Sequence, residues 1–358
     1  MERIRNYELG VMTATHAFKL MNELGKCGEP FLFILDFDVS KPLVLSLSEL
    51  QNSSEIRFDI NGQHNFTPLR ISLSKSVFFD KKPISYADYK AKFDFILENL
   101  QYGNSFLINL TQPTAIETNL SLLEIFQNSS AKYKLLVDTD TDKFVVFSPE
   151  IFVKIDENGV ISSNPMKGTI DAAIENAEIR LMLDAKEQAE HATIVDLIRN
   201  DLSQVATKVR VERYRYIDRV QTFDKTLLQA SSKIVGQLPS DFKEHLGDIF
   251  QKLLPAGSIC GAPKPKTVEI IKNTEGYERG YYTGIVGIFD GKTVDSGVMI
   301  RFIEQNNENE LIFKSGGGIT AMSDAESEYL EMINKVYVPI ITRNNSHPER
   351  NTAKCVGA

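Results

Sequence analysis

Two segments of the sequence each carry a pair of glutamates three residues apart. Glu187 and Glu190 lie in "AKEQAEHATIVDLIRND", and Glu328 and Glu331 lie in "AESEYLEMINKVY". Residues at this spacing share one helix face, so each pair brings two carboxylates together. A solvated helix face explains either pair alone. If both pairs faced one cleft, their charge would favour a cation, and ligands that are all oxygen suit Mg²⁺.

A single lysine lies in a short segment that contains proline and glycine. In "SSNPMKGTIDAA", Lys167 stands between Pro165-Met166 and Gly168-Thr169. Such a segment predicts a turn, and a lysine in a turn is usually solvated. A chemical role for this amine therefore needs support from the rest of the chain.

Other groups are suited to binding an anion. The segment "FKSGGGITAMSDAESEY" places Gly316, Gly317 and Gly318 between a strand and a helix, where bare backbone amides could hold a carboxylate. A tight strand-to-helix turn is the alternative. Arg301 ends the alternating run "SGVMIRFIE" at a position that is usually apolar, so its guanidinium needs a substrate carboxylate or a cross-strand acid. Tyr282 is either a hydroxyl donor or a core aromatic.

The composition favours a globular protein that binds small molecules or other proteins. The 358 residues include 42% hydrophobic ones, enough for a large core, and the net charge of -8 argues against a nucleic-acid surface. No run of about 18 apolar residues could span a bilayer, and the first residues lack the apolar core of a signal peptide. Three scattered cysteines fit a reducing cytoplasm.

Hairpins and helices must position these groups. Turn signals at Asn158-Gly159 and Asp290-Gly291 each predict an antiparallel pair, and "RFIEQNNENELIFKSGGG" joins two more strands through a polar loop. Apolar periodicity predicts helices within residues 171–206, 241–254, 265–274 and 323–341. The pattern therefore predicts an α+β chain with sizeable antiparallel sheets.

Taken in order, eight motifs resemble those of the chorismate-utilising enzymes. They are "FSPEIF", "PMKGT", "KEQAEH" with "IVDLIRND", "LPAGSICGAPK", "YYTGIVG", "VMIRF", "SGGGI" and "ESEYLEMINK", between Phe147 and Val338. The resemblance implies two large antiparallel β-sheets packed together and flanked by helices, with the active site between them. We expect one domain: a strand-rich portion at 1–75, the chorismate-binding core at 76–342 and a flexible tail at 343–358.

The same resemblance implies roles for residues at the motif positions. Glu190 and Glu328 correspond to the main Mg²⁺ ligands, with Glu187 and Glu331 beside them. Glu150, in the "SPE" motif, corresponds to the acid/base near the C4 hydroxyl of chorismate. The implied substrate-binding residues are Thr169, Ser258, Tyr282, Arg301, Gly316, Gly317, Gly318 and Lys335.

Two positions distinguish between the reactions of this family. Leu107 stands where isochorismate and salicylate synthases carry the lysine that activates water, and a leucine cannot serve as a base. Related synthases often have a glutamine there. Lys167 stands where anthranilate synthases have alanine, and a lysine at this position is the mark of aminodeoxychorismate synthase component I. The resemblance therefore implies covalent attack by Lys167 on C2 of chorismate.

The implied enzyme is a cytoplasmic, Mg²⁺-dependent aminodeoxychorismate synthase, a transferase that makes 4-amino-4-deoxychorismate from chorismate and ammonia. A separate aminodeoxychorismate lyase would then complete p-aminobenzoate for folate biosynthesis. The chain has no recognisable glutaminase nucleophile, so a glutamine amidotransferase subunit would supply the ammonia. Anthranilate synthase component I is one alternative, and a non-catalytic chorismate-binding regulatory protein is another.

Overall fold

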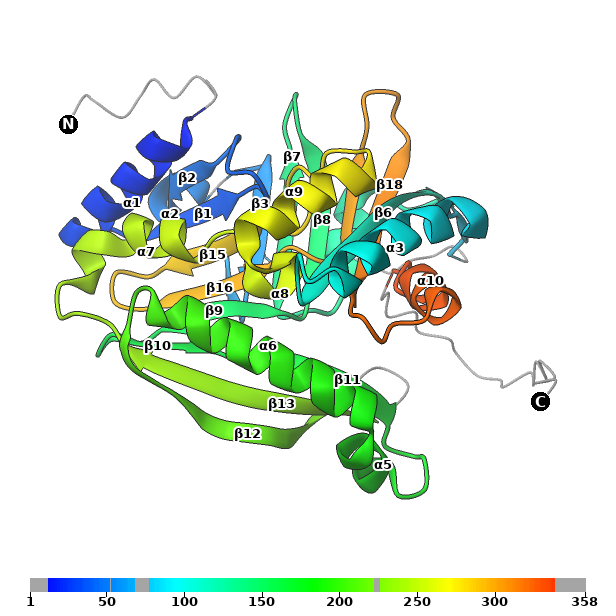
Figure 1. Cartoon of the computed structure of the whole chain (residues 1–358). Helices are drawn as coiled ribbons and strands as arrows, with labels where there is room; N and C mark the ends of the chain where they lie inside the picture. Colours follow the sequence, from blue (N-terminus) through cyan, green and yellow to red (C-terminus); the bar gives the residue numbers. More distant parts are fainter. Residues whose placement is uncertain (1–11, 52, 68–76, 222–225, 339–358) are drawn as a thin grey trace.

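The computed structural model describes residues 12–51, 53–67, 77–221 and 226–338. In these ranges the strands form two nine-stranded antiparallel sheets, with helices packed against both (Figure 1). The predicted α+β fold of two large antiparallel sheets is therefore confirmed. The predicted flexible tail, 343–358, lies outside the described residues. Within the described part, no helix combines the length and the apolar character needed to cross a bilayer.

The first sheet has the strand order β11-β13-β10-β9-β16-β15-β1-β2, and β12 pairs with β13. Its strands are β1 (Phe31–Leu35), β2 (Leu43–Ser46), β9 (Ile151–Ile155), β10 (Val160–Ser163), β11 (Met166–Asp171), β12 (Thr207–Gln221), β13 (Thr226–Gln237), β15 (Ile285–Phe289) and β16 (Val294–Val298). Strand β1 lies between β2 and β15, and all five of its residues are buried. Its unbroken apolar sequence "FLFIL" is typical of a strand that is buried on both faces.

The second sheet has the order β14-β6-β18-β17-β8-β7-β3-β4, and β5 pairs with β6. Its strands are β3 (Ile56–Ile60), β4 (Gln63–His64), β5 (Phe79–Lys82), β6 (Leu107–Thr118), β7 (Tyr133–Asp138), β8 (Lys143–Ser148), β14 (Gly261–Ala262), β17 (Phe302–Gln305) and β18 (Leu311–Ile319). The N-terminal portion supplies β1 and β2 to the first sheet and β3 and β4 to the second. It therefore shares both sheets with the rest of the chain.

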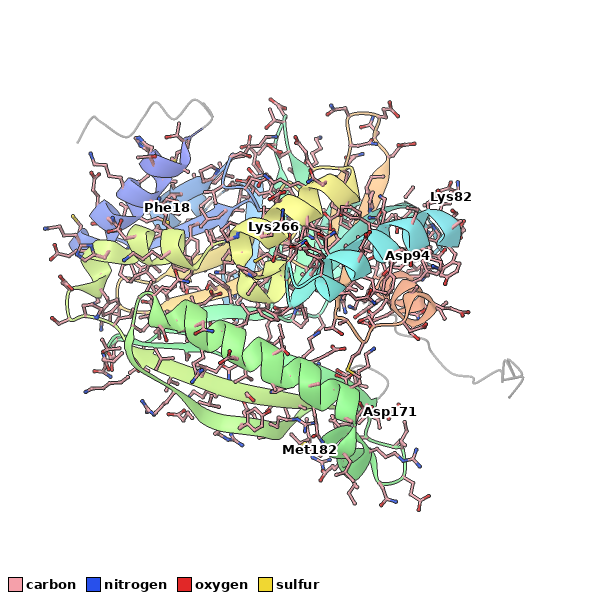
Figure 2. All side chains as sticks on the ribbon, in the orientation of Figure 1. Phe18, Lys82, Asp94, Asp171, Met182 and Lys266 are labelled. Carbon is pink, nitrogen blue, oxygen red and sulfur yellow. The ribbon has the colours of Figure 1, made fainter. Side chains whose placement is uncertain are left out.

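Helices cover both sheets. They are α1 (Ala14–Cys27), α2 (Leu47–Leu50), α3 (Tyr86–Gln101), α4 (Leu122–Asn128), α5 (Ala177–Leu183), α6 (Ala185–Ser203), α7 (Leu246–Leu253), α8 (Gly257–Cys260), α9 (Lys264–Glu275) and α10 (Ala325–Asn334), with a 3₁₀ turn at Phe242–His245. Helix α6 lies across β11, β12 and β13, whereas α3 and α10 lie against β18 (Figure 1). Phe18 of α1 and Lys82 of β5 lie on opposite sides of the view in Figure 2.

The two sheets pack directly on one another. Leu32 and Val286 of the first sheet share a buried cluster with Leu135 of the second. Gly297 of β16 permits the close approach, because a Cβ atom there would lie 2.4 Å from the Tyr133 ring of β7. A larger residue at this position would push the sheets apart.

Two chain segments pass from one sheet to the other, side by side. One joins β8 to β9 and contains Glu150, and the other joins β16 to β17 and contains Arg301. Backbone hydrogen bonds tie the two together, from Val298 N to Glu150 O and from Phe147 N to Arg301 O, each 3.1 Å long. Both side chains are thereby held at the junction of the sheets.

The three predicted hairpins are confirmed, since β9 pairs with β10, β15 with β16 and β17 with β18. The second turn is centred one residue later than predicted, on Gly291 and Lys292, because Asp290 N still donates to Thr293 O at 3.1 Å. The helical pattern at 171–206 becomes two helices. Asp184 is extended between α5 and α6, and its side chain accepts a hydrogen bond from Glu187 N as the N-cap of α6.

A buried ion pair fastens α9 to the second sheet. Arg279 Nη2 lies 2.6 Å from Glu275 Oε1, and both side chains are almost fully buried. The same carboxylate accepts hydrogen bonds from Thr111 N and Oγ1 of β6, at 2.8 and 2.7 Å. Arg279 Nη2 also donates to Asn109 O of β6 at 2.8 Å. Strand β6 is therefore held in place by a charged network without access to water.

Replacing Glu275 by leucine should lower the free energy of unfolding by about 3–5 kcal/mol, because Arg279 would remain buried without its counter-charge. The midpoint of urea unfolding, followed by circular dichroism, measures the effect. Glu278→Leu is the matched control, since Glu278 is exposed and its loss should change stability by less than about 0.5 kcal/mol. Equal midpoints for the two variants would contradict the role of the pair.

Candidate active site

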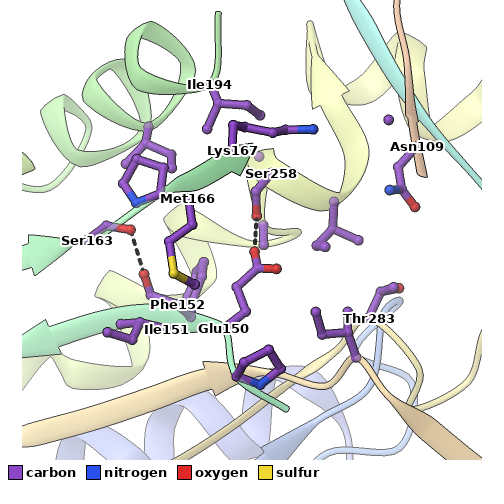
Figure 3. A pocket seen from close by; sticks show the side chains of 18 of the residues that line it. Asn109, Glu150, Ile151, Phe152, Ser163, Met166, Lys167, Ile194, Ser258 and Thr283 are labelled. Atoms are coloured by element: carbon purple, nitrogen blue, oxygen red, sulfur yellow. Dashed lines mark hydrogen bonds between the residues drawn. The ribbon is translucent and has the colours of Figure 1, made fainter. Parts of the chain in front are cut away.

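A cavity of about 300 Å³ lies where the two sheets meet α6, α8 and α10. Its size suits a small-molecule ligand. The predicted site residues that line it are Glu150, Lys167, Thr169, Ser258, Tyr282, Arg301, Gly316, Gly317, Gly318, Glu331 and Lys335. The other three lie beside this lining, Glu187 next to Gly168, Glu190 next to Lys167 and Glu328 next to Gly317. The structure thus brings residues from widely separated motifs to one place (Figure 3).

Lys167 lies in a strand, so the predicted turn is wrong. It belongs to β11 and pairs with Ala230 of β13, and a bulge follows it, with Gly168 at a φ of +78°. Glycine is needed there both for this angle and because a Cβ atom would lie 2.8 Å from Leu181. The Lys167 amine extends into the cavity (Figure 3) and lies 3.3 Å from Glu190 Oε2.

Glu150 faces the cavity beside Ser258. The Ser258 hydroxyl donates a hydrogen bond of 3.0 Å to Glu150 Oε1 (Figure 3). Burial raises the pKa of Glu150 above its ordinary value, and the hydrogen bond from Ser258 only partly offsets this. The carboxyl group is therefore suited to hold a proton and release it to a leaving group.

Asp201 and Lys264 fix the short helix that carries Ser258. Their side chains form an ion pair of 2.8 Å with little exposure. Helix α8 packs against Asp201 so closely that a Cβ atom on Gly257 would lie 2.6 Å from Asp201 Oδ2. Neither residue was predicted from the sequence, although Asp201 lies in "IVDLIRND" and Lys264 ends "LPAGSICGAPK".

Helices α6 and α10 bring the two glutamate pairs toward each other. The Lys186 ammonium bridges them, 3.8 Å from Glu190 Oε1 and 3.4 Å from Glu328 Oε1. Burial and then a neighbouring carboxylate raise the pKa of Glu187 and of Glu328 above their ordinary values. The carboxylates therefore favour a cation between them. Lys186, which was not predicted as a site residue, is a cation at that place.

The ligand chemistry of this cluster fits Mg²⁺, because it offers only carboxylate oxygens. In the described ranges, however, no three His, Cys, Asp or Glu side chains converge closely enough to hold an ion. Lys186 occupies the space between Glu190 and Glu328 instead. The four glutamates as Mg²⁺ ligands therefore stay a prediction.

Arg301 does not lie inside a strand as predicted, but in the connection between β16 and β17 with a φ of +56°. Arg301 lines the cavity, and its guanidinium lies over the Tyr337 ring, 5.5 Å from the ring centre. The alternative of a cross-strand ion pair is wrong, since Arg301 lies outside the strands. Arg301 is thus available to an anionic ligand.

The three glycines lie within β18 rather than in a strand-to-helix turn. Gly316, Gly317 and Gly318 pair with Thr111, Leu110 and Asn109 of β6. Strand β17 pairs with β18 only as far as Phe302 and Lys314. On the edge of β18 away from β6, alternate glycine N–H groups therefore have no strand partner. All three glycines line the cavity.

Lys335 is tied down beside the glycines. Its amine donates to Gly316 O at 2.8 Å and lies 2.7 Å from Glu331 Oε1. Burial acts to raise the pKa of Glu331, but the neighbouring Lys335 ammonium outweighs burial and brings this pKa below its ordinary value. Tyr282 is buried, and burial raises the pKa of its hydroxyl, so it stays protonated as a donor. Thr169 Oγ1 accepts a hydrogen bond from Gln229 at 3.2 Å.

The sequence pattern of the chorismate binding enzyme family matches residues 46–340. The chain belongs to this family. Its members use chorismate, so the protein is a chorismate-utilising enzyme. A protein of Haemophilus influenzae, named as an uncharacterized PabA-like protein, is 49% identical over 332 residues, covering 92% of this chain and 98% of that protein.

More distant members of the family differ in the reactions that their names give. Aminodeoxychorismate synthase of Arabidopsis thaliana is 36% identical over 198 residues, covering 54% of this chain and 21% of that protein. Anthranilate synthase component 1 of Archaeoglobus fulgidus is 32% identical over 246 residues, covering 67% and 58%. Among solved structures, the menaquinone-specific isochorismate synthase MenF of Escherichia coli has a TM-score of 0.69 at 15% identity, covering 90% of this chain and 81% of MenF. This last similarity concerns the fold.

Proposed function

We propose that this chorismate-utilising enzyme is aminodeoxychorismate synthase component I. The observation that carries the proposal is the position of Lys167, whose amine enters the cavity next to Glu190. The Glu150–Ser258 pair supplies an acid in the same cavity. An amine able to attack and an acid able to protonate a leaving group are the two requirements of amination through a covalent intermediate.

Substrate binding in this proposal depends on the anion-binding side of the cavity. Arg301, the Tyr282 hydroxyl and the free glycine amides of β18 hold one carboxylate of chorismate, with Lys335 close by. Lys167 then attacks C2 as the neutral amine, both ring double bonds shift, and the C4 hydroxyl leaves as water with the proton of Glu150. Ammonia adds at C4 and expels Lys167 from C2, and the new amine returns its extra proton to Glu150.

Magnesium belongs to this proposal through the four glutamates, with Glu190 and Glu328 as main ligands and Glu187 and Glu331 beside them. When bound, the metal would withdraw charge from the ring carboxylate as a Lewis acid. Lys186 would have to leave its position between Glu190 and Glu328 to admit the ion, because its ammonium lies within 4 Å of both carboxylates.

Removal of Mg²⁺ with a chelator should therefore abolish turnover, and Glu328→Gln should weaken Mg²⁺ binding about tenfold or more, since 1.4 kcal/mol of lost coordination is a factor of ten. Calorimetric titration of the free protein with Mg²⁺ measures the second effect without any turnover. Glu326→Gln, an exposed glutamate on the same helix, is the matched control. Identical Mg²⁺ affinities for the two variants would remove Glu328 from the ligand set.

The proposed partners follow from the substrates. A glutamine amidotransferase subunit supplies the ammonia, and a separate aminodeoxychorismate lyase uses the product in making p-aminobenzoate for folate biosynthesis, both in the cytoplasm. Anthranilate synthase component I is the second candidate, because the Archaeoglobus fulgidus enzyme of that name is 32% identical over 246 residues. The anthranilate synthase reaction would also eliminate pyruvate. A non-catalytic chorismate-binding regulator would neither aminate chorismate nor eliminate pyruvate.

One assay separates these functions. The purified chain is incubated with chorismate, Mg²⁺ and a high concentration of ammonium, with and without the lyase. We expect chorismate to be converted to 4-amino-4-deoxychorismate, with p-aminobenzoate appearing only when the lyase is added. Fluorescent anthranilate without lyase would overturn the proposal in favour of anthranilate synthase. Unchanged chorismate would favour the regulator.

A further inference from the structure

The side-chain amide of Asn109 is an unused hydrogen-bonding group at the wall of the cavity. Asn109 lines the cavity, yet its Oδ1 atom is buried and accepts no hydrogen bond from the described residues. A buried carbonyl oxygen without a donor is unfavourable, and such atoms are rare in folded proteins. The amide oxygen therefore lacks a donor, and a half-turn of the amide about its Cβ–Cγ bond would bring the oxygen to the cavity, where a ligand could supply one (Figure 3).

Asn109 lies in the wall of the cavity toward which the Lys167 amine points. Asn109 pairs directly with Gly318 across β6 and β18, and paired residues project from the same face of a sheet. A Cβ atom on Gly318 would lie 3.7 Å from the Lys167 amine and 3.3 Å from Leu107 Cδ1. The Lys167 amine points toward the side on which Asn109 lies (Figure 3).

The backbone that carries the amide is held firmly. Asn109 O accepts a hydrogen bond of 2.8 Å from Arg279 Nη2, and Arg279 is paired with Glu275 in the buried network under β6. Binding groups on a strand that is fixed in this way keep their geometry better than groups on loops.

We propose that Asn109 binds the ammonia that aminates chorismate, an inference that rests on the proposed function. Ammonia can attack only when its lone pair points at carbon, so its N–H groups need acceptors. Leu107 offers no acceptor, and the Lys335 ammonium in the cavity wall only donates. A neutral amide oxygen favours ammonium much less than a carboxylate would, and ammonium cannot attack because its lone pair is already used.

In the step that Asn109 would serve, the ammonia lone pair forms the bond from nitrogen to C4. The bond between C2 and the Lys167 nitrogen breaks, and its electrons leave with the lysine as a neutral amine while both ring double bonds shift back. The protonated amine at C4 then gives a proton to the Glu150 carboxylate. Asn109 holds the incoming nitrogen throughout and exchanges no proton.

Steady-state kinetics of Asn109→Leu test this inference, with ammonium chloride varied at saturating chorismate and Mg²⁺. We expect kcat/KM for ammonium to fall about tenfold to a hundredfold, the range for one lost hydrogen bond, with the KM for chorismate unchanged. Asn158→Leu makes the same chemical change in the exposed β9–β10 turn and should match the wild type. Melting curves check folding, and Asn109→Ala replaces the leucine variant if that variant melts early.

An unchanged kcat/KM for ammonium in the Asn109 variants would overturn the inference. A raised KM for chorismate would also overturn it, because the amide would then bind chorismate. Either result leaves the proposed function standing, provided that the product is still 4-amino-4-deoxychorismate. A wild-type protein that forms anthranilate or no product refutes the proposed function itself. The two failures are therefore distinguishable.

Discussion

Replacing Lys167 by alanine should slow the amination of chorismate by about a thousandfold or more, the scale of losing a covalent nucleophile. The reason is that the Lys167 amine forms the covalent bond to C2 in the proposed reaction, and the neighbouring Leu107 cannot replace it. Chorismate binding should persist, since Arg301, Tyr282 and the glycines of β18 are untouched. Turnover is measured with ammonium as the nitrogen source, and chorismate affinity by calorimetry.

Lys292→Ala is the matched control, because Lys292 is exposed in the β15–β16 turn. It should keep wild-type turnover. A Lys167→Ala variant with wild-type turnover would show that ammonia attacks chorismate without a covalent intermediate. Loss of chorismate binding together with turnover would make Lys167 a binding residue instead.

Replacing Glu150 by glutamine should lower kcat by about 10²–10⁴-fold, the usual contribution of general acid catalysis. Glutamine keeps an acceptor for Ser258 at nearly the same shape but cannot protonate the leaving C4 hydroxyl. The KM for chorismate should change little, because Glu150 acts on the leaving group. Full kinetics of this variant and of Glu157→Gln, a change in the exposed β9–β10 turn, measure the difference.

The result that would remove Glu150 from the acid role is a variant whose kcat equals that of Glu157→Gln. A large rise in the KM for chorismate with kcat intact would instead place Glu150 among the binding groups. The raised pKa of Glu150 is consistent with the acid role, since burial keeps the carboxyl protonated to higher pH than an exposed glutamate.

Much of the fold could be predicted from local patterns. Hairpins follow from strong signals such as Asn158-Gly159, and the buried strand β1 follows from an unbroken apolar run. The break between α5 and α6 was missed because apolar spacing continues through both helices, while a single capping residue, Asp184, separates them. The order of strands within each sheet depends on long-range pairing, such as that of β1 with β15, which no local pattern contains.

The site was predictable where an ordered motif carried it. Glu150, Lys167 and Arg301 were found in this way and line one cavity. The conformation at Lys167 was not predictable, because Pro165 and Gly168 give the same local signal for a turn and for a bulged strand. The role of Lys186 between two carboxylates depends on the approach of α6 and α10, a tertiary contact.

The most direct measurement of the central claim is the mass of the intact protein after incubation with chorismate and Mg²⁺ in the absence of ammonia. We predict a fraction of the protein carrying chorismate less one water, mapped to Lys167 by peptide analysis, and its disappearance when ammonium is added. The Lys167→Ala variant should show no such species. A wild-type protein that turns over chorismate and ammonium efficiently, yet never forms an adduct at Lys167, would contradict the account.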